Sequence, residues 1–210
     1  MYYLLGGSGV PNYGDELMAG GWLRYLARKN SGARVVIDTN VPSISTLLLQ
    51  PENWKSSHVS VVKSLATQNP LEHFWQNFER GYKFFARGGF SKYARLSAFD
   101  DYLRNTQIFH LFGGGYISDK WPHTGFLLGF AGAAQAEYGF RLVGTGLGIT
   151  PISAPPPALD KTARRVLNRF QMIELRDQSS AAFISKISGN DNSFHGLDDS
   201  FLEPVKPLAD

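Results

Sequence analysis

The residues best suited to chemistry stand in a glycine-rich bend near the start of the chain. The bend runs from Gly6 to Met18 (GGSGVPNYGDELM), between a short apolar segment and a helical pattern. Its glycines, Gly7 among them, let the backbone approach a ligand closely, and Asn12 and Asp15 add an amide and a carboxylate. Because the first turn of a helix attracts anions and polar hydroxyl groups, the bend predicts a ligand site.

Spacing disfavours the two common nucleotide motifs at this bend. Gly9 and Gly14 are separated as in a phosphate-binding P-loop, but Asp15-Glu16 stand where lysine and serine or threonine would bind phosphate and magnesium. The dinucleotide fingerprint lacks its third glycine, which is Asn12 here, and only Asp38 would supply the acidic residue after the second strand. A nucleoside triphosphate and a dinucleotide cofactor are therefore poor matches.

Two later apolar segments also end in candidate residues. The first is followed by Gly113, Gly114 and Gly115, which supply backbone amides toward an anion, a tight turn, or both. His123 stands in the same loop, and we predict that it faces the ligand as an acid or base. The second segment is followed by Arg176, whose guanidinium can hold a carboxylate or phosphate through two parallel hydrogen bonds.

Each charged candidate also has a structural interpretation that the sequence leaves open. Asp15 accepts a hydrogen bond from a ligand hydroxyl or acts as a base, or else it caps the helix that begins beside it. Arg176 binds a ligand anion, or else it forms a salt bridge with Asp15 or Asp177. Asp198 and Asp199 are adjacent, so on an extended chain their side chains point opposite ways, which argues against a shared proton.

A parallel sheet is the element that would bring these residues together. Strand-like apolar segments alternate with helical patterns, which predicts an α/β domain with a Rossmann-like parallel sheet and helices on both faces. The expected strands are 2–7, 34–39, 59–65, 107–112, 141–146 and 172–176. The expected helices are 14–29, 42–50, 70–87, 92–105, 124–138, 160–170 and 178–187. Ligands of such sheets gather beyond the carboxyl ends of the strands, where the candidates lie.

Composition indicates a folded, soluble domain. The chain has 210 residues, of which 43% are hydrophobic and 19% charged, enough to bury a core. It has no cysteine, so it has neither disulfides nor a thiolate metal site, and a cytoplasmic protein is expected. No membrane span or signal peptide is predicted. Residues 151–157, with four prolines, are expected to form a stiff connector.

One segment, residues 79–96, carries the whole positive excess of the chain, whose net charge is +3. Its basic residues are Arg80, Lys83, Arg87, Lys92 and Arg95, against Glu79 alone. So small an excess does not predict nucleic-acid binding. The aromatic and basic stretch 78–90 has two interpretations. In the first, its aromatic face packs on the sheet and its basic face meets solvent. In the second, it lies on the anionic inner face of the membrane as a peripheral segment.

Five motifs at strand ends, taken in order, resemble the polysaccharide pyruvyl transferase family. They are Asn12-Tyr13-Gly14-Asp15-Glu16, Phe112-Gly113-Gly114-Gly115, GTGLGITP at 144–151, RDQSS at 176–180 and LDDSFL at 197–202. The resemblance spans nearly the full chain and implies one half of a GT-B fold. Because family members continue into a second Rossmann-like domain that carries a catalytic histidine, residues 1–210 are expected to form a single N-terminal domain.

The resemblance implies a transferase that moves the enolpyruvyl group of phosphoenolpyruvate onto a sugar as a cyclic ketal. No metal or other cofactor is implied. Ketal formation needs an acid, a base for two sugar hydroxyls, and cations for phosphate and carboxylate. Asp15 and His123 are then the catalytic candidates. The substrate-binding candidates are Gly7, Asn12, Asp15, Gly113, Gly114, Gly115 and Arg176.

The implied acceptor is a polysaccharide or a lipid-linked glycan. The expected partners are therefore this glycan, an anionic membrane contacted peripherally, and a second copy of the chain, with no nucleic acid. Two other functions stay open. One is a nucleotide-sugar glycosyltransferase of GT-B type, in which a diphosphate meets helix N-termini. The other is a non-catalytic glycan-binding or assembly module.

Overall fold

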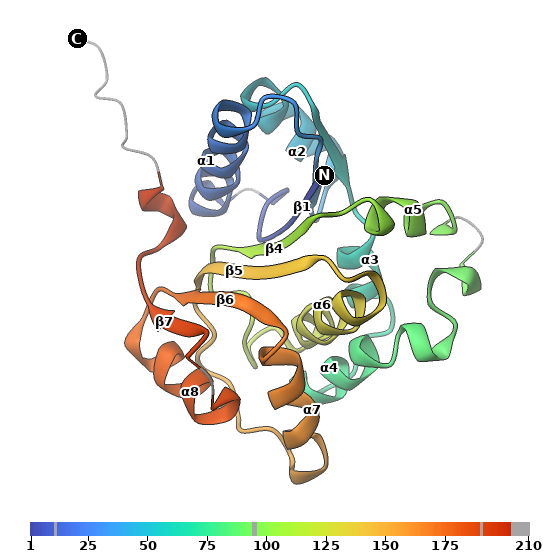
Figure 1. Ribbon diagram of the computed structural model, residues 1–210, viewed down its shortest axis with the longest axis vertical. Coiled ribbons are helices and arrows are strands. Elements are labelled where there is room, and N and C mark those ends of the chain that lie inside the picture. The colour runs from blue at the N-terminus through green and yellow to red at the C-terminus, as the bar shows by residue number, and fades with distance from the viewer. Residues whose placement is uncertain (11, 94–95, 190, 203–210) are drawn as a thin grey trace.

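A computed structural model describes residues 1–210 except 11, 94–95, 190 and 203–210 (Figure 1). Its centre is a seven-stranded sheet in the order β3-β2-β1-β4-β5-β6-β7, and each strand is parallel to its neighbours. The strands are β1 (Tyr2–Leu5), β2 (Val35–Asp38), β3 (Ser56–Val59), β4 (Ile108–Phe112), β5 (Arg141–Leu147), β6 (Phe170–Leu175) and β7 (Ser193–His195). The predicted α/β class and Rossmann-like sheet are confirmed.

Helices lie on both faces of this sheet. On one face, α1 (Tyr13–Lys29) and α2 (Pro42–Leu49) pack against β1, β2 and β4. The other face is covered by the later helices, which are α3 (Val62–Thr67), α4 (Phe74–Tyr82), α5 (Phe99–Arg104), α6 (Gly125–Tyr138), α7 (Pro157–Leu167) and α8 (Gln178–Ser188). Short 3-10 turns include η5 (Pro122–Thr124) and η6 (Asp199–Phe201). None of the helices in the described part of the chain is long and apolar enough to cross a membrane.

The predicted strand at 59–65 is wrong. The strand β3 ends at Val59, and the next residues form the helix α3. The cause is Asp38, which is fully buried at the end of β2 and accepts hydrogen bonds from the backbone N–H groups of Val61, Val62 and Lys63. These bonds satisfy amides that a helix start leaves without partners. A carboxylate from another strand thus overrides the local preference of β-branched residues for a strand.

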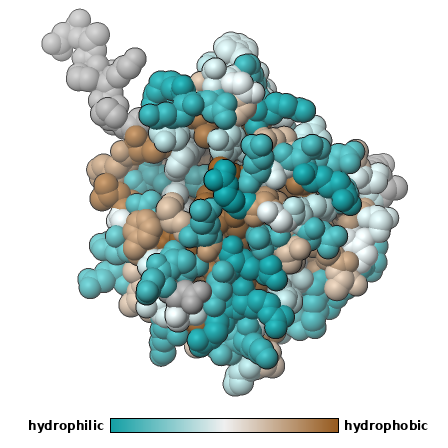
Figure 2. All heavy atoms as spheres, viewed as in Figure 1, coloured by the Kyte–Doolittle hydropathy of each residue, from teal (hydrophilic) through white to brown (hydrophobic). Residues whose placement is uncertain are grey.

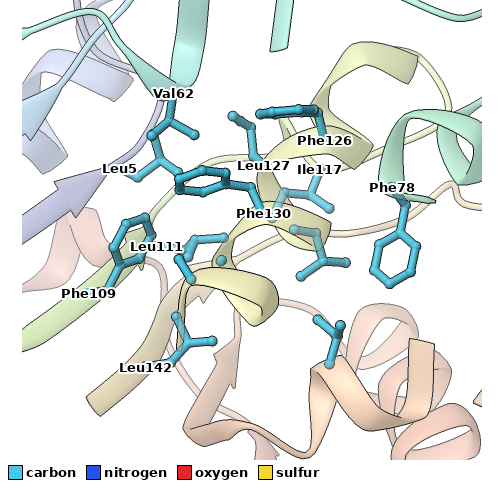
Figure 3. Close-up of a cluster of buried hydrophobic side chains, with 14 of the residues drawn as sticks. Leu5, Val62, Phe78, Phe109, Leu111, Ile117, Phe126, Leu127, Phe130 and Leu142 are labelled. Atoms are coloured by element: carbon cyan, nitrogen blue, oxygen red, sulfur yellow. The ribbon is translucent and has the colours of Figure 1, made fainter. Parts of the chain in front are cut away.

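The core follows the alternation of side chains along the strands. Figure 3 shows Leu5 of β1 with Phe109 and Leu111 of β4, gathered with Leu127 and Phe130 of α6. All five are fully buried. The neighbouring strand residues Leu4 and Phe112 point to the opposite face of the sheet, where they join a second cluster with α1. Truncating one of these core phenylalanines to alanine would cost about 3–5 kcal/mol, so both faces are firmly anchored.

The aromatic stretch 78–90 belongs to the core. Helices α4 and α6 touch backbone to backbone, since a Cβ on Gly125 would lie 2.2 Å from the carbonyl oxygen of Phe74 and one on Gly129 2.0 Å from that of Phe78. Phe78, Phe84 and Phe90 are buried. The aromatic side chains of this stretch are buried, as the first interpretation expects, but Phe84 packs against Phe126 and Phe130 of α6 rather than directly on the sheet.

The basic residues of the same stretch are partly engaged. Arg80 donates hydrogen bonds to the carbonyls of Leu65, Ala66 and Gln68 and so closes the end of α3. Lys83 pairs with Glu79. Arg80, Arg87 and Lys92 line a cavity of about 270 Å³ that none of the predicted site residues lines. Arg95 lies outside the described residues. Contact with a membrane stays a prediction, and co-sedimentation with acidic vesicles at low salt would test it.

Candidate functional site

The predicted residues meet where the connections of the sheet diverge. From β1 the chain turns toward β2 and β3, whereas from β4 it turns the opposite way, toward β5 and β6. The loops after β1 and β4 therefore leave the same edge side by side, which is the usual ligand position in open parallel sheets.

Asp15 lies in the first turn of α1, with its carboxylate against the opening bend. A Cβ on Gly7 would lie 2.6 Å from Cγ of Asp15, so any larger residue at this position would displace the carboxylate. Asn12 is the N-cap residue, because its Oδ1 accepts a hydrogen bond from the amide of Gly14 at 3.2 Å. Nδ2 of Asn12 donates to Oδ2 of Asp15 at 2.8 Å. Asp15 is thus not the cap, and its Oδ1 accepts no hydrogen bond from the described residues.

The charge of Asp15 is balanced between burial and two cations. Burial of the half-buried carboxyl raises its pKa above the ordinary value, and this effect is the largest. Lys63 and Arg176 act against it, and so does the hydrogen bond from Asn12. A carboxylate in this position can accept a hydrogen bond and then a proton.

The Gly113–Gly115 bend approaches the same carboxylate at Gly114. Gly113 and Gly114 have positive φ angles of +53° and +78°, which glycine adopts without strain, so the tight-turn interpretation is confirmed. A Cβ on Gly114 would lie 3.3 Å from Oδ1 of Asp15. The amide of Gly113 donates to the carbonyl of Thr145 at 2.9 Å. That amide is therefore occupied, and anion binding by the amides of Gly114 and Gly115 stays a prediction.

The loop after β4 holds Arg176 together with the loop after β5. A Cβ on Gly115 would lie 3.0 Å from Nη2 of Arg176, and one on Gly148 2.7 Å from its Nε. Nη1 of Arg176 donates to Asp198 at 2.8 Å. The salt bridge of Arg176 is thus made with Asp198, and not with Asp15 or the adjacent Asp177 as the sequence suggested. The Nη2 and Nε edge makes no hydrogen bond to the described residues.

Asp177 and Asp199 have other partners. Asp177 caps α8 by accepting a hydrogen bond from the amide of Ser180 at 2.7 Å. Asp199 points away from Asp198, as predicted, and accepts a hydrogen bond from the Thr145 hydroxyl at 2.9 Å. The indole N–H of Trp22 also faces this carboxyl, in a geometry short of a full hydrogen bond.

Thr145 joins Asp199 to the buried His110. The ring Nε2 of His110 lies 2.7 Å from Oγ1 of Thr145, and since the Thr145 hydroxyl donates to Asp199, Nε2 carries the proton. Burial raises the pKa of Asp199 to about 6 and lowers that of His110 to about 3. His110 is therefore a neutral core histidine.

Lys63 is a residue of this edge that sequence reasoning missed. Its side chain is only 7% exposed, and Nζ lies 5.0 Å from the centre of the Tyr116 ring. Burial lowers the pKa of Lys63 to about 8, against the attraction of Asp38 and Asp15. The available signal was a single lysine inside the apolar segment 59–66, and the strand assignment hid it.

His123 is near the cation Lys63 but shares no described hydrogen bond with the other candidates. It lies half-buried in η5, and its pKa is lowered by burial and by the nearby cations Lys63 and Arg80. No described hydrogen bond joins it to Asp15 or Arg176. The neutral imidazole could serve as a base, but its catalytic role stays a prediction.

The supposed dinucleotide acid is also accounted for. Asp38 accepts hydrogen bonds from the Tyr3 hydroxyl and from three backbone amides of the turn that begins α3. Because the side chain is fully buried, it cannot reach a ribose hydroxyl. Glu16 likewise accepts from the amide of Gly9 at 2.6 Å and so holds the bend closed where a P-loop would bind phosphate.

Comparison with known protein families agrees with this geometry. The family model for polysaccharide pyruvyl transferase matches residues 12–209, which contain all five strand-end motifs. The chain belongs to the polysaccharide pyruvyl transferase family. No curated protein and no solved structure matches it.

The edge of this pyruvyl transferase family member carries charges of both signs. The cations are Lys63 and Arg176, and the carboxylates around them are Asp15, Asp38, Asp198 and Asp199. A ligand rich in hydroxyl groups meets both donors and acceptors there. Among the described residues, no group of three or more His, Asp or Glu side chains is arranged to hold a metal ion.

Proposed function

We propose that this protein transfers the pyruvyl group of phosphoenolpyruvate onto a sugar of a polysaccharide or lipid-linked glycan as a ketal, and that the edge between β1 and β4 holds the sugar. Family membership supports the reaction class. The observation that carries the assignment of the edge is the half-buried Asp15, whose Oδ1 lies beside Gly114 and accepts no hydrogen bond from the described residues.

The reaction requires two additions at one carbon. Each of two sugar hydroxyls forms a bond to C2 of the enolpyruvyl group and gives up its proton. The first proton is taken by C3, which becomes a methyl group as the double bond is lost, and the second leaves with inorganic phosphate as the bond from C2 to the phosphate oxygen breaks. In this scheme Asp15 accepts a hydrogen bond from a sugar hydroxyl and takes its proton as the C–O bond forms. The step needs the ionised form, which Lys63 and Arg176 favour.

Arg176 is the donor-side residue of this scheme. Its Nη1 is held by Asp198, which fixes the guanidinium plane between Gly115 and Gly148. The remaining Nη2 and Nε edge is suited to a carboxylate or phosphate oxygen of phosphoenolpyruvate, because the fork of Arg matches two oxygens at once.

Incubation with phosphoenolpyruvate and a set of glycans tests the proposal. The expected products are inorganic phosphate and a glycan with a new methyl singlet in its proton NMR spectrum. A thermal shift experiment with phosphoenolpyruvate and with nucleotide sugars separates the alternative, since stabilisation by nucleotide sugars alone would contradict pyruvyl transfer. Glycan binding without any phosphate release would favour the non-catalytic module.

A further inference from the structure

Lys63 is a buried cation whose donors have no partner among the described residues. Its ammonium carries three N–H groups, and none of them makes a hydrogen bond or ion pair there. Burying a charge is costly unless it is paired and hydrogen-bonded, and contact with the face of an aromatic ring offsets only part of that cost. The donors of Lys63 are therefore available to a ligand.

Tyr116 connects Lys63 to Asp15. The Tyr116 hydroxyl donates to the carbonyl of Leu5 at 3.1 Å, which places the ring over the end of β1. One Cβ position, that of Gly114, lies 3.1 Å from the Tyr116 ring and 3.3 Å from Oδ1 of Asp15. Lys63 and Asp15 thus approach the same ring, yet they form no ion pair within 4.0 Å.

We propose that Lys63 and Asp15 bind the same hydroxyl group of the acceptor sugar, a step that rests on the proposed function. A hydroxyl is one donor and two acceptors. Oδ1 of Asp15 accepts its proton, and the ammonium of Lys63 donates to a lone pair of its oxygen. The pair then holds the hydroxyl with its proton directed at Asp15. The ammonium of Lys63 stabilises the negative charge that develops on the hydroxyl oxygen as the proton leaves.

The groups around Lys63 favour a neutral hydroxyl over an anion. Asp38 faces it from β2, Asp15 from α1, the Tyr116 ring from the loop after β4, and the half-buried His123 from η5. A phosphate or carboxylate at this point would meet two carboxylates, whereas a hydroxyl meets one donor and one acceptor. The pKa of about 8 for Lys63 keeps the ammonium form predominant at neutral pH.

Titration of the full chain with methyl glycosides tests the pair without requiring turnover. Binding of a panel of methyl hexopyranosides would be followed by NMR at pH 7 and pH 9 for wild type, Lys63→Met, Lys63→Arg and Lys161→Met. Lys161 is an exposed lysine of α7 and serves as the matched control. We expect Lys63→Met to bind about tenfold more weakly at pH 7, Lys63→Arg to keep part of the affinity, and Lys161→Met to match wild type.

The pH dependence separates a ligand contact from a packing role. Wild-type affinity should fall between pH 7 and pH 9 as Lys63 loses its proton, and Lys63→Met should lose that dependence. If wild type and Lys63→Met bind a glycoside equally at both pH values, the inference is overturned while the proposed function stands. If phosphoenolpyruvate rather than the glycoside loses affinity in Lys63→Met, the hydroxyl assignment is wrong. If no glycoside binds wild type, the acceptor-side proposal fails and the inference fails with it.

Discussion

Two pairs of opposite charges flank the candidate site, and they differ in whether the partners touch. Arg176 and Asp198 are in contact at 2.8 Å, with 36% and 23% of their side chains exposed. Lys63 and Asp15 form no ion pair, although Lys63 is almost fully buried. Burying a charge without a partner is costly, so the ammonium of Lys63 gains more from a ligand than the exposed pair does.

The difference suggests separate tasks for the two sides. The closed pair fixes one guanidinium across two glycine loops, so its main effect is to orient Arg176. Both members of the open pair keep hydrogen-bonding groups for a ligand, whereas in the closed pair only Arg176 does and Asp198 orients it. We therefore expect changes to Asp15 or Lys63 to affect activity and binding, and a change to Asp198 to have a smaller effect.

The largest effect is expected for Asp15→Asn, which removes the acceptor and the base of the open pair. Pyruvyl transfer should fall by about 10²-fold or more, the usual range for a lost general base. Asp160→Asn is the matched control, because Asp160 also lies in the first turn of a helix, α7. Phosphate release from phosphoenolpyruvate measures both. Equal activity of the Asp15 and Asp160 variants would remove Asp15 from the mechanism.

Asp199 anchors the segment that carries the closed pair, and its titration should appear in stability. Its pKa of about 6 lies above the ordinary 3.8, so the folded state holds the proton more tightly. Asp199 should thus add about 3 kcal/mol to the free energy of unfolding as the pH falls from above 6 to below about 4.

Comparison with Asp199→Asn isolates this contribution. The comparison is needed because His110 also affects stability in this pH range. Its pKa is lowered to about 3 in the folded protein, so its contribution to the free energy of unfolding is lost as the pH falls. Urea denaturation at pH 7.5 and pH 4 should show the difference between wild type and Asp199→Asn shifting in favour of wild type at the lower pH. A difference that is the same at both pH values would contradict the assignment.

A smaller effect is expected from Gly7→Ala, which crowds the open pair without removing a charge. The new Cβ would fall 2.6 Å from Cγ of Asp15 and push the carboxylate out of place. Glycoside binding should weaken by roughly tenfold, the effect of losing one charge-assisted hydrogen bond. Gly14→Ala is the control, since its Cβ would have ordinary contact at 3.6 Å. Unchanged binding in both variants would mean that the position of Asp15 is unimportant.

The smallest effect is expected from Asp198→Asn, which opens the closed pair. Because both side chains are partly exposed, the free energy of unfolding should change by less than about 1 kcal/mol. Chemical denaturation measures it. A loss of several kcal/mol would show that the closed pair is a main stabiliser of the fold. Its role would then not be limited to orienting Arg176.

Sequence reasoning found the open side only in part. The bend, Asp15 and the Gly113–Gly115 turn are local patterns, and the alternation of elements was enough to bring them to one edge. Lys63 was hidden because a carboxylate 25 residues earlier in the chain, Asp38, starts the helix α3 in an apolar segment with strand character. The partner of Arg176 was also missed, since Asp198 lies 22 residues away in sequence.

The segment after β7 also has side-chain partners that the local sequence does not predict. Figure 2 shows apolar atoms at the left edge, over the region from β7 to η6, where Leu197 and Phe201 are 65% and 71% exposed. Its motif was recognisable in the sequence, but the opposite directions of Asp198 and Asp199 acquire meaning only from their partners Arg176 and Thr145. Pairings across such distances depend on the register of the sheet rather than on local composition.

In the proposed function, the edge between β1 and β4 binds the acceptor sugar around Asp15. Titration of ¹⁵N-labelled protein with methyl glycosides, followed by amide chemical shifts, tests it most directly. We predict saturable shifts at Gly7, Asp15 and Gly114, which weaken in Asp15→Asn. Shifts confined to the cavity near Arg80 and Arg87, with the three edge amides unchanged, would show that the sugar binds away from Asp15.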